Sequence, residues 1–352
     1  MRDILPVLEE WSQTTGRIAL ATVMRTWGSS PRGVGAKMAL TPDGKIAGSV
    51  SGGCVEGAVF ETGLAVLTSG VPQLVHFGVA DETAWSVGLA CGGQLDVFIR
   101  PLDPDVLPLY HAAFQAGKAL CTAIVVRGPQ DWFGKELLVS GGQRLAGGID
   151  PALDDAIIAQ AGRPAAGLVD YETRGGPIEV FFDVVAPQPV LVIVGGAHTS
   201  IPLANIARTL DYYTVVVDPR RAFGNAERFP DVDRLLQAWP QDVLPELDLG
   251  DNTAIAVLTH DPKIDDPALV LALQSQAFYV GALGSPTTQA ARRQRLLAAG
   301  VPPEQLARIH GPIGLKLGSD TPQELALAIM AEIVAARHGA LVKTQAAVGV
   351  AA

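Results

Sequence analysis

The sequence has few cysteines. Only Cys54, Cys91 and Cys121 occur among its 352 residues. An odd and small number excludes a framework of disulfides, and the reducing cytosol would not maintain one. A cysteine with a special role in this chain therefore acts through its thiol. Cys121 lies inside the apolar run 119–126, where we expect an inert core residue.

Clusters of positive charge are also missing. The chain has 26 Lys and Arg against 36 Asp and Glu, a net charge of −10, and no dense basic run. This balance argues against wholesale binding to the backbone of nucleic acids or to an anionic membrane. The expected ligand is therefore a small molecule.

Long hydrophobic segments are absent as well. The apolar stretch 325–331 is followed by Glu332 and falls short of the roughly 20 residues that a membrane-spanning helix needs. The first eleven residues include Asp3, Glu9 and Glu10 and have no apolar core of the kind found in signal peptides. We therefore expect a cytoplasmic protein without a membrane segment.

The chain is rich in apolar residues, at 48%, and contains 38 Gly and 25 Pro. This composition is typical of a globular chain with many turns between strands and helices. At roughly 150 residues per domain, the length predicts two domains. Pro187 and Pro189 favour an extended connector, so we place an N-terminal domain at 1–186, a C-terminal domain at 187–340 and a flexible tail at 341–352.

Strands outnumber helices in the first domain. Asp43 and Gly44 mark a hairpin turn, and Gly70 is positioned to cap a helix whose N-terminus follows Cys54. The pattern predicts a mixed α+β domain. Its expected strands are 17–25, 37–41, 45–50, 73–78, 94–100, 119–127 and 136–146, and its expected helices are 55–68, 104–116 and 151–161.

Short apolar strands alternate with amphipathic helices after residue 187. Alternation of this kind is the pattern of consecutive βαβ units, so the second domain is predicted to be α/β, a Rossmann-like doubly wound parallel sheet. The expected strands are 190–194, 214–217, 254–258 and 278–280, and the expected helices are 200–210, 288–299 and 322–336.

The first turn of the second domain has the outline of a dinucleotide-binding fingerprint. Gly195 and Gly196 follow a strand, and Asp218 comes 23 residues after the first glycine. Glycines allow a pyrophosphate to approach a helix N-terminus, and the acidic residue binds ribose hydroxyls, here favouring NAD over NADP. Because Ala197 and Ser200 replace the other two glycines, a Rossmann-like turn without a dinucleotide is the alternative.

Three histidines follow expected strands of this domain, at the sheet edge where ligands bind in such folds. His198, His260 and His310 lie in polar or glycine-rich segments, and Asp261 follows the second of them. We expect these four side chains to line one crevice as metal ligands or cofactor contacts. The alternative is three separate loop histidines that hydrogen-bond to the backbone.

The loop 28–35 of the first domain is rich in small residues. Its free backbone amides, together with Ser30, Arg32 and the nearby Lys37, are suited to bind a phosphate. A glycine loop alone is not specific evidence for such a site.

The loop 48–57 makes a more specific prediction, because it delivers a thiol to the start of a helix. Ser51, Gly52 and Gly53 precede Cys54, and the helix dipole favours its thiolate, an effect that Glu56 opposes in part.

Cys91 has a similar setting, since Gly92 and Gly93 follow it. Two cysteines beside glycine turns suggest a site for a soft metal or for sulfur, with Cys54 and Cys91 as ligands. The alternative is a pair of buried, inert thiols. The chain has no G-x-S-x-G, HExxH or Walker lysine motif, so a self-contained hydrolase is not indicated.

Several long motifs resemble the XdhC/CoxI family of accessory factors for xanthine dehydrogenase and related molybdenum hydroxylases, and the likeness covers nearly the whole chain. The matching segments are GSSPRGVGAKM (28–38), GSVSGGCVEGAV (48–59), GLACGG (88–93), THDPKIDDPAL (259–269), YVGALGS (279–285) and HGPIGLKLGSDTPQELALAIMAEI (310–333). The chain departs from the family's usual pattern at Ala197, where a second glycine is more common.

The resemblance implies a cytosolic maturation factor without catalytic residues. Such a factor binds the molybdenum cofactor, a molybdopterin, protects it while its terminal sulfur ligand is installed, and passes it to apo-xanthine dehydrogenase or a related enzyme. A cysteine desulfurase is the implied sulfur donor. The clustering of these residue types on glycine loops leads to our hypothesis for the site: Cys54 or Cys91 contacts the molybdenum or its sulfur, Arg32, Lys37 and loop amides hold phosphate, and the histidines complete the site.

Two other functions stay open from the sequence. The turn at Gly195 and Asp218 suits an NAD(P)-dependent oxidoreductase, and a docking protein would deliver a partner without touching the cofactor. A homodimer is the common default for such a chain.

Overall fold

The computed structural model describes residues 1–78, 93–162 and 166–341. The chain divides into two compact units, Met1–Pro187 (unit 1) and Gln188–Ala352 (unit 2). In the part of the chain that the structure describes, no helix is long and apolar enough to cross a membrane.

Unit 1 contains two five-stranded antiparallel sheets. In sheet 1 the strand order is β3-β2-β1-β5-β4, and in sheet 2 it is β8-β7-β6-β10-β9. The strands of sheet 1 are β1 (Ala19–Trp27), β2 (Lys37–Leu40), β3 (Ile46–Gly48), β4 (Gln73–Phe77) and β5 (Gln94–Pro101). Those of sheet 2 are β6 (Leu120–Arg127), β7 (Glu136–Ser140), β8 (Gln143–Gly147), β9 (Gly167–Thr173) and β10 (Gly176–Val185).

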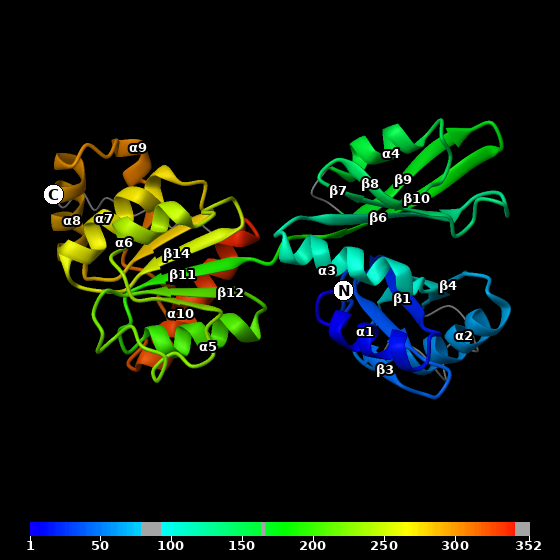
Figure 1. The fold of residues 1–352 in the computed structure, drawn as a ribbon, viewed down its shortest axis with the longest axis horizontal. Coiled ribbons are helices and arrows are strands. Elements are labelled where there is room, and N and C mark those ends of the chain that lie inside the picture. Colours follow the sequence, from blue (N-terminus) through cyan, green and yellow to red (C-terminus); the bar gives the residue numbers. More distant parts are fainter. Residues whose placement is uncertain (79–92, 163–165, 342–352) are drawn as a thin grey trace, which may run out of the picture. The chain divides into compact units, whose positions relative to one another are not determined.

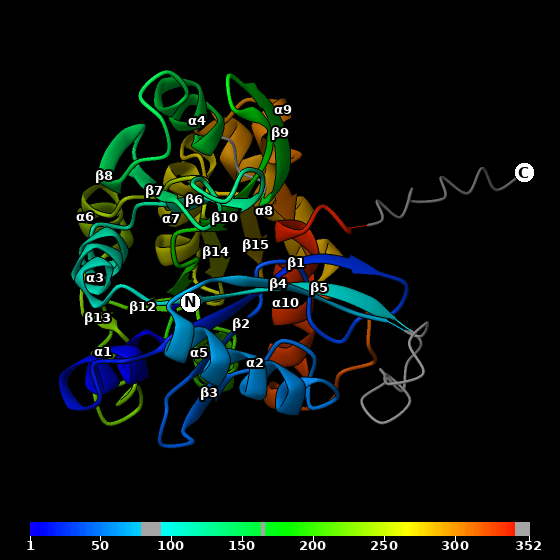
Figure 2. The ribbon, with the colours of Figure 1, turned by 90° about the vertical axis from the view of Figure 1, so that its right-hand side faces the viewer.

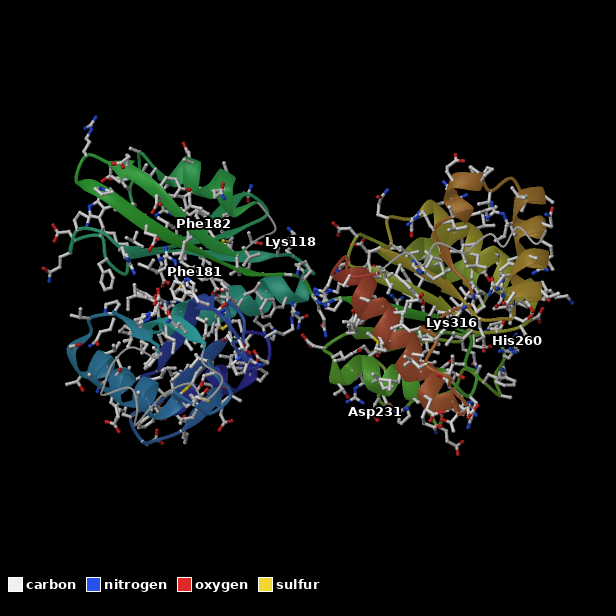
Figure 3. All side chains as sticks on the ribbon, turned by 180° about the vertical axis from the view of Figure 1, so that it is seen from behind. Lys118, Phe181, Phe182, Asp231, His260 and Lys316 are labelled. Carbon is white, nitrogen blue, oxygen red and sulfur yellow. The ribbon has the colours of Figure 1, made fainter. Side chains whose placement is uncertain are left out.

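The two sheets of unit 1 pack face to face, with one helix outside each of them (Figures 1 and 2). Side chains alternate along each strand, so Phe181 of β10 packs between the sheets while Phe182 packs on the side of α4 (Figure 3). The helices are α1 (Leu5–Thr14), α2 (Glu56–Ser69) on sheet 1, α3 (Leu107–Gln115), and α4 (Asp154–Ala161) on sheet 2.

Charged side chains connect the facing sheets around a small apolar cluster that includes Met24, Phe98 and Phe181. Each pair takes one partner from each sheet, and the resulting complementarity favours a single register of packing. The pairs are Lys37 with Asp183, Arg25 with Glu179, Asp96 with Arg127, and Arg100 with Glu136.

Unit 2 is built around a six-stranded parallel sheet of order β13-β12-β11-β14-β15-β16. Helices α5 and α10 cover one face, and α7, α8 and α9 cover the other (Figure 1). The strands are β11 (Val190–Val194), β12 (Tyr213–Val217), β13 (Arg234–Leu236), β14 (Thr253–Val257), β15 (Tyr279–Ala282) and β16 (Ile309–His310). The helices are α5 (Ser200–Thr209), α6 (Pro240–Val243), α7 (Pro262–Gln274), α8 (Pro286–Ala298), α9 (Pro303–Leu306) and α10 (Pro322–Arg337).

The predicted fold classes of both halves are confirmed, and the differences are local. The expected helix 55–68 is α2, and Gly70 ends it in the left-handed conformation with φ of 72°. The expected strand 136–146 is a hairpin instead, because Gly141 and Gly142 both have positive φ, 57° and 75°, and turn the chain between β7 and β8. The sequence did not predict α1, β9 and β10 in unit 1, or β13, α6, α7 and α9 in unit 2.

Candidate functional site

The glycine-rich segments of unit 1 meet at one end of sheet 1. Strands β1 and β5 pair antiparallel with Trp27 opposite Gln94, so the loop after β1 lies beside Gly93, which precedes β5. A side chain at Gly93 would place its Cβ only 2.1 Å from the Ser29 carbonyl oxygen. Glycine is therefore required here for the close approach of two backbone segments.

The loops 28–35 and 48–54 also lie against each other. A Cβ at Gly52 would be 3.6 Å from the Cβ of Pro31. Arg32 Nε donates to the Ser49 carbonyl oxygen at 3.3 Å, and Ser30 Oγ donates to the Arg32 carbonyl oxygen at 2.7 Å. The structure thus brings together Ser30, Arg32, Gly52 and Gly93, which the sequence had singled out separately.

The loop 28–35 retains free hydrogen-bond donors at this end of the sheet. Within the described residues, no group accepts a hydrogen bond from the amides of Arg32, Gly33 and Val34, and all three residues are exposed. Adjacent free amides beside an arginine are the ordinary means of holding a phosphate. The loop therefore has the donor groups on which the predicted phosphate site depends, and phosphate binding stays a prediction.

The second loop differs from the expectation, because an internal carboxylate already occupies it. Glu56 Oε1 accepts hydrogen bonds from the amides of Val50, Ser51 and Gly52 at 3.2, 2.9 and 3.1 Å, and Oε2 accepts one from the Gly53 amide at 2.8 Å. These amides are not free for a phosphate. We expected Glu56 to contact the cofactor and to weaken the thiolate in part, but its carboxylate fixes the loop in front of α2.

The environment of Glu56 stabilises its ionised form strongly. Partial burial alone would raise the pKa of this carboxyl, but hydrogen bonds from Ser49 and Ser51 outweigh it and lower the pKa to about 2. Glu56 is therefore ionised at any physiological pH.

Cys54 lies two residues before the start of α2, as the sequence predicts. Its thiol is free and half-buried against the apolar residues between sheet 1 and α2. Cys121 is buried in β6, where burial and the nearby charge of Asp183 raise the pKa of its thiol to about 12. Of the two thiols in the described part of the chain, only that of Cys54 is accessible. Cys91 and Gly92 lie outside the described residues.

Lys37 has a different environment from the one the sequence suggested. Its ammonium is buried between the sheets, 2.7 Å from Asp183 Oδ1 and 2.9 Å from the Gly35 carbonyl oxygen. Only 2% of the Lys37 side chain is exposed, so its charge serves the packing of the sheets. Arg32 is then the cation that the glycine-rich loops offer to a ligand.

In unit 2 the loops that follow the strands lie at one edge of the parallel sheet, which we call the C-terminal edge. His198 follows β11, Asp218 follows β12, and His260 follows β14. Figure 3 marks this edge by His260. Because parallel strands end at the same edge, the expected site residues of this unit share it.

The turn after β11 is held by interactions within the unit. Gly195 has φ of 105°, and a Cβ there would lie 2.3 Å from Thr259 Cγ2, so only glycine fits between β11 and β14. Ser200 Oγ donates to the Gly195 carbonyl oxygen at 2.5 Å, which explains a serine at the position of the third glycine.

The carboxylate of Asp218 is hydrogen-bonded to neighbouring residues and is shielded from solvent. The side chain is completely buried, and it accepts a hydrogen bond from the Gly196 amide at 2.7 Å and two from the Arg220 guanidinium at 2.9 and 2.7 Å. Burial would raise the pKa of this carboxyl, but the bonds from Arg220 and Gly196 hold it below its usual value. A carboxylate engaged in this way is not available to ribose hydroxyls, which favours a turn without a dinucleotide.

An exposed aromatic ring between two arginines lies beside this turn. The Phe223 ring is 39% exposed, with the Arg220 guanidinium 4.2 Å and the Arg228 guanidinium 5.8 Å from its centre. Arg228 Nη2 also donates to the Gly196 carbonyl oxygen at 3.1 Å. The sequence reasoning did not identify this surface, although the basic and aromatic residues of 220–229 carry the signal.

The three histidines have different surroundings. His198 and His260 are exposed, whereas His310 stacks on the Tyr279 ring at 4.5 Å, with Nδ1 3.3 Å from Glu332 Oε1. Asp261 caps α7 by accepting a hydrogen bond from the Lys263 amide at 2.9 Å. Across residues 1–78, 93–162 and 166–341, no three His, Cys, Asp or Glu side chains are grouped so that they could hold a metal ion.

A buried ion pair lies beneath the C-terminal edge and was also missed. Arg292 Nη2 donates to Asp265 Oδ2 at 2.9 Å and to the Leu283 carbonyl oxygen at 3.0 Å, and Asp265 also accepts from the Thr259 hydroxyl. Burial raises the pKa of Asp265 despite these partners. The pair connects the loops after β14 and β15.

Family comparisons agree with this architecture. A model described as the XdhC Rossmann domain matches residues 191–333, and a model of the XdhC and CoxI family matches residues 11–78. The two matches together span more than half of the chain, one in each unit. The chain therefore belongs to the XdhC and CoxI family.

Similar proteins cover almost the whole length. The chain is 28% identical over 323 residues to a probable xanthine dehydrogenase subunit of Bacillus subtilis, covering 90% of this chain and 92% of that protein. It is 26% identical over 337 residues to the molybdenum cofactor insertion chaperone PaoD of Escherichia coli, covering 96% and 88%. A solved structure described as a xanthine dehydrogenase from Bacillus halodurans matches at 24% identity with a TM-score of 0.77 over 97% of both chains, which shows a shared fold.

Proposed function

We propose that this chain is a maturation factor that binds the molybdenum cofactor, protects it during sulfuration and delivers it to xanthine dehydrogenase or a related molybdenum hydroxylase. In this role the chain is not itself an enzyme. The cofactor is its cargo, the apo-enzyme is its acceptor, and a cysteine desulfurase is the source of sulfur. The observation that carries the proposal is that the loop with Arg32 and the amides of 32–34, which have no acceptor among the described residues, lies against the loop that leads to the accessible Cys54.

The donor groups in unit 1 fit the chemistry of such a cargo. A molybdopterin carries a phosphate and a soft, sulfur-bound metal, and a thiolate is the protein ligand that soft metals prefer. In our proposal Arg32 and the amides of 32–34 hold the phosphate, and Cys54 contacts the molybdenum or its sulfur. Glu56 positions the thiol by fixing the preceding loop. Cys91 is proposed as a second thiol.

In unit 2 we propose the C-terminal edge as a further contact surface for the cargo or its phosphate. His198 and His260 are exposed there, and Arg220 and Arg228 flank the exposed ring of Phe223. Aromatic rings flanked by arginine suit planar, anionic ligands through stacking and charge. An NAD(P)-dependent oxidoreductase is not proposed, because Asp218 and the Gly196 amide are engaged with each other.

Reconstitution of an acceptor enzyme tests this function. Cofactor-free xanthine dehydrogenase would be mixed anaerobically with sulfurated cofactor, either free or loaded on this chain, and substrate oxidation followed with time. We expect faster and more complete recovery of activity from the loaded chain. Recovery at the same rate and yield from the free cofactor would contradict a role in protection and delivery.

A further inference from the structure

An exposed tryptophan lies directly before the loop 28–35. Trp27 is the last residue of β1, and 43% of it is exposed. Because β1 and β5 pair with Trp27 opposite Gln94, this residue lies at the end of sheet 1 where Ser29 approaches Gly93. Its ring therefore offers a flat apolar surface next to the loop that we propose for phosphate.

His76 of β4 lies beside this tryptophan. The centres of the two rings are 5.8 Å apart and their planes meet at 65°. The His76 side chain is 56% exposed. Since Val75 and Phe77 pack against the α2 side of sheet 1, His76 points to the opposite face. The indole and the imidazole thus form an exposed aromatic corner at this end of the sheet, which we call the Trp27–His76 corner.

A buried carboxylate fixes the orientation of His76. Its Nδ1 is 2.7 Å from Asp96 Oδ1, and only 7% of the Asp96 side chain is exposed. An ionised carboxylate only accepts hydrogen bonds, so Nδ1 carries the proton in this pair and the neutral ring keeps a lone pair on Nε2. In the described part of the chain no group is hydrogen-bonded to this Nε2. Asp96 therefore holds a free acceptor at an exposed position.

The backbone after His76 leaves space for this orientation of the imidazole. A Cβ at Gly78 would lie 2.9 Å from His76 Nε2 and 3.2 Å from Gln94 Cγ. A side chain at this position would push the imidazole away, so glycine permits the orientation that Asp96 sets.

We propose that the Trp27–His76 corner binds the pterin ring of the cofactor. The inference rests on the proposed function, whose cargo has a pterin at one end and its phosphate and metal at the other. The planar ring stacks on the Trp27 indole, and an N–H group of its pyrimidine part donates to His76 Nε2.

The phosphate of the same molecule can reach the loop with Arg32. Arg32 follows Trp27 by five residues, so their Cα atoms are at most about 18 Å apart. The cofactor and the two side chains span this distance together. One ligand therefore contacts the corner through its ring and the loop through its phosphate.

Equilibrium dialysis with 6-hydroxymethylpterin phosphate, detected by its own fluorescence, tests the inference on the full chain. This probe has the pterin ring and a phosphate but no metal, so its binding does not depend on a cysteine. We expect saturable binding with a Kd below about 1 mM. Trp27→Ala should weaken it at least about fivefold, as the loss of a stacking aromatic does. Trp239→Ala, at a tryptophan of unit 2 that is 42% exposed, is the matched control and should bind as wild type does.

The hydrogen bond to His76 is tested separately. His76→Phe keeps a ring beside Trp27 but removes Nε2, and it should weaken binding by about threefold to tenfold, the effect of one hydrogen bond. The wild-type chain should discriminate by a similar factor against the same probe methylated on N3 and twice on the 2-amino nitrogen, because this analogue keeps the bicyclic ring and loses the N–H groups. That comparison needs no variant. Both replaced side chains are exposed, so the variants should fold, and their melting temperatures check this.

Any one of these results would overturn the inference: no saturable binding up to about 10 mM, tenfold above a millimolar Kd, wild-type affinity in either variant, or equal binding of the methylated probe. Retention of the complete molybdenum cofactor, measured in parallel, separates the two proposals. Retention that is equal in wild type and both variants would contradict the inference alone. A wild-type chain that retains no cofactor but binds the pterin probe through Trp27 would contradict the proposed function alone.

Discussion

The carboxylate of Glu56 accepts a hydrogen bond of 2.8 Å from the amide of Gly53, three residues earlier in the chain. Together with the bonds from Ser51 and Gly52, this contact closes the loop before α2 around an internal negative charge. The bonded carboxylate fixes the loop that leads to Cys54, and in our proposal the anion is bound by the neighbouring loop with Arg32.

Glu56→Gln should destabilise unit 1 at neutral pH. The amide retains the shape but loses the charged acceptor, and hydrogen bonds to charged groups contribute more than neutral ones, so we expect a loss of about 1–3 kcal/mol in the free energy of unfolding. Urea unfolding measures it. Glu61→Gln, at an exposed position of the same helix, is the matched control and should change the free energy by less than about 0.5 kcal/mol.

The difference in unfolding free energy between wild type and Glu56→Gln should also depend on pH. The pKa of Glu56 is lowered from 4.5 to about 2, so its stabilising effect is complete above pH 4.5 and is lost as pH falls towards 2. The difference in unfolding free energy between wild type and Glu56→Gln should therefore shrink in that window. A difference that stays constant from neutral pH to the acid limb would contradict the hydrogen bonding described here.

Lys37→Met should be strongly destabilising, because it leaves Asp183 buried without its cation. We expect a cost of about 3–5 kcal/mol, measured by urea unfolding. The double variant Lys37→Met with Asp183→Leu removes both charges and should recover much of that loss. If the single variant were as stable as wild type but retained less cofactor, Lys37 would be a ligand contact and our placement of its charge would be wrong.

Added NAD should leave the melting temperature unchanged. Asp218 and the Gly196 amide bond to each other, so the acid that would hold ribose and the first amide of the turn are already engaged, and a ligand that does not bind the folded state cannot stabilise it. Thermal unfolding with and without NAD measures this. A rise with NAD in wild type that disappears in Asp218→Asn would support the dinucleotide alternative instead.

Arg32→Ala should separate binding from stability. Arg32 is exposed, and among the described residues its side chain makes one hydrogen bond, of 3.3 Å, so its removal should change the unfolding free energy by less than about 1 kcal/mol. Retention of the cofactor should fall several-fold, and less so at high salt, because the contact to phosphate is electrostatic. Arg174→Ala, at an exposed turn between β9 and β10, is the control and should bind as wild type does.

The sequence predicts those features that depend on neighbouring residues. Helix α2 and its end at Gly70 follow from local periodicity and from one glycine with positive φ. The parallel sheet of unit 2 follows from the alternation of strands and helices, and the family follows from long motifs. Each of these signals lies within a few tens of residues.

The sequence did not show which charged side chains pair with each other in the folded chain. Lys37 pairs with Asp183, 146 residues away, and nothing near Lys37 in the chain indicates that its charge is buried. Asp218 matched a ribose-binding acid by spacing alone, while the Arg220 that occupies it lies two residues later. Both cases depend on which face of a strand or turn packs inward, which only the folded chain defines.

Anaerobic gel filtration of the chain with free molybdenum cofactor tests the central claim most directly. Wild type, Cys54→Ser and the core control Cys121→Ser would be loaded in parallel, and the oxidised pterin of each protein peak measured by its fluorescence. We predict stoichiometric pterin with wild type and Cys121→Ser, and a clear loss with Cys54→Ser. A folded wild-type protein whose peak contains no pterin would contradict the proposed function, and full retention by Cys54→Ser would contradict the role of its thiol.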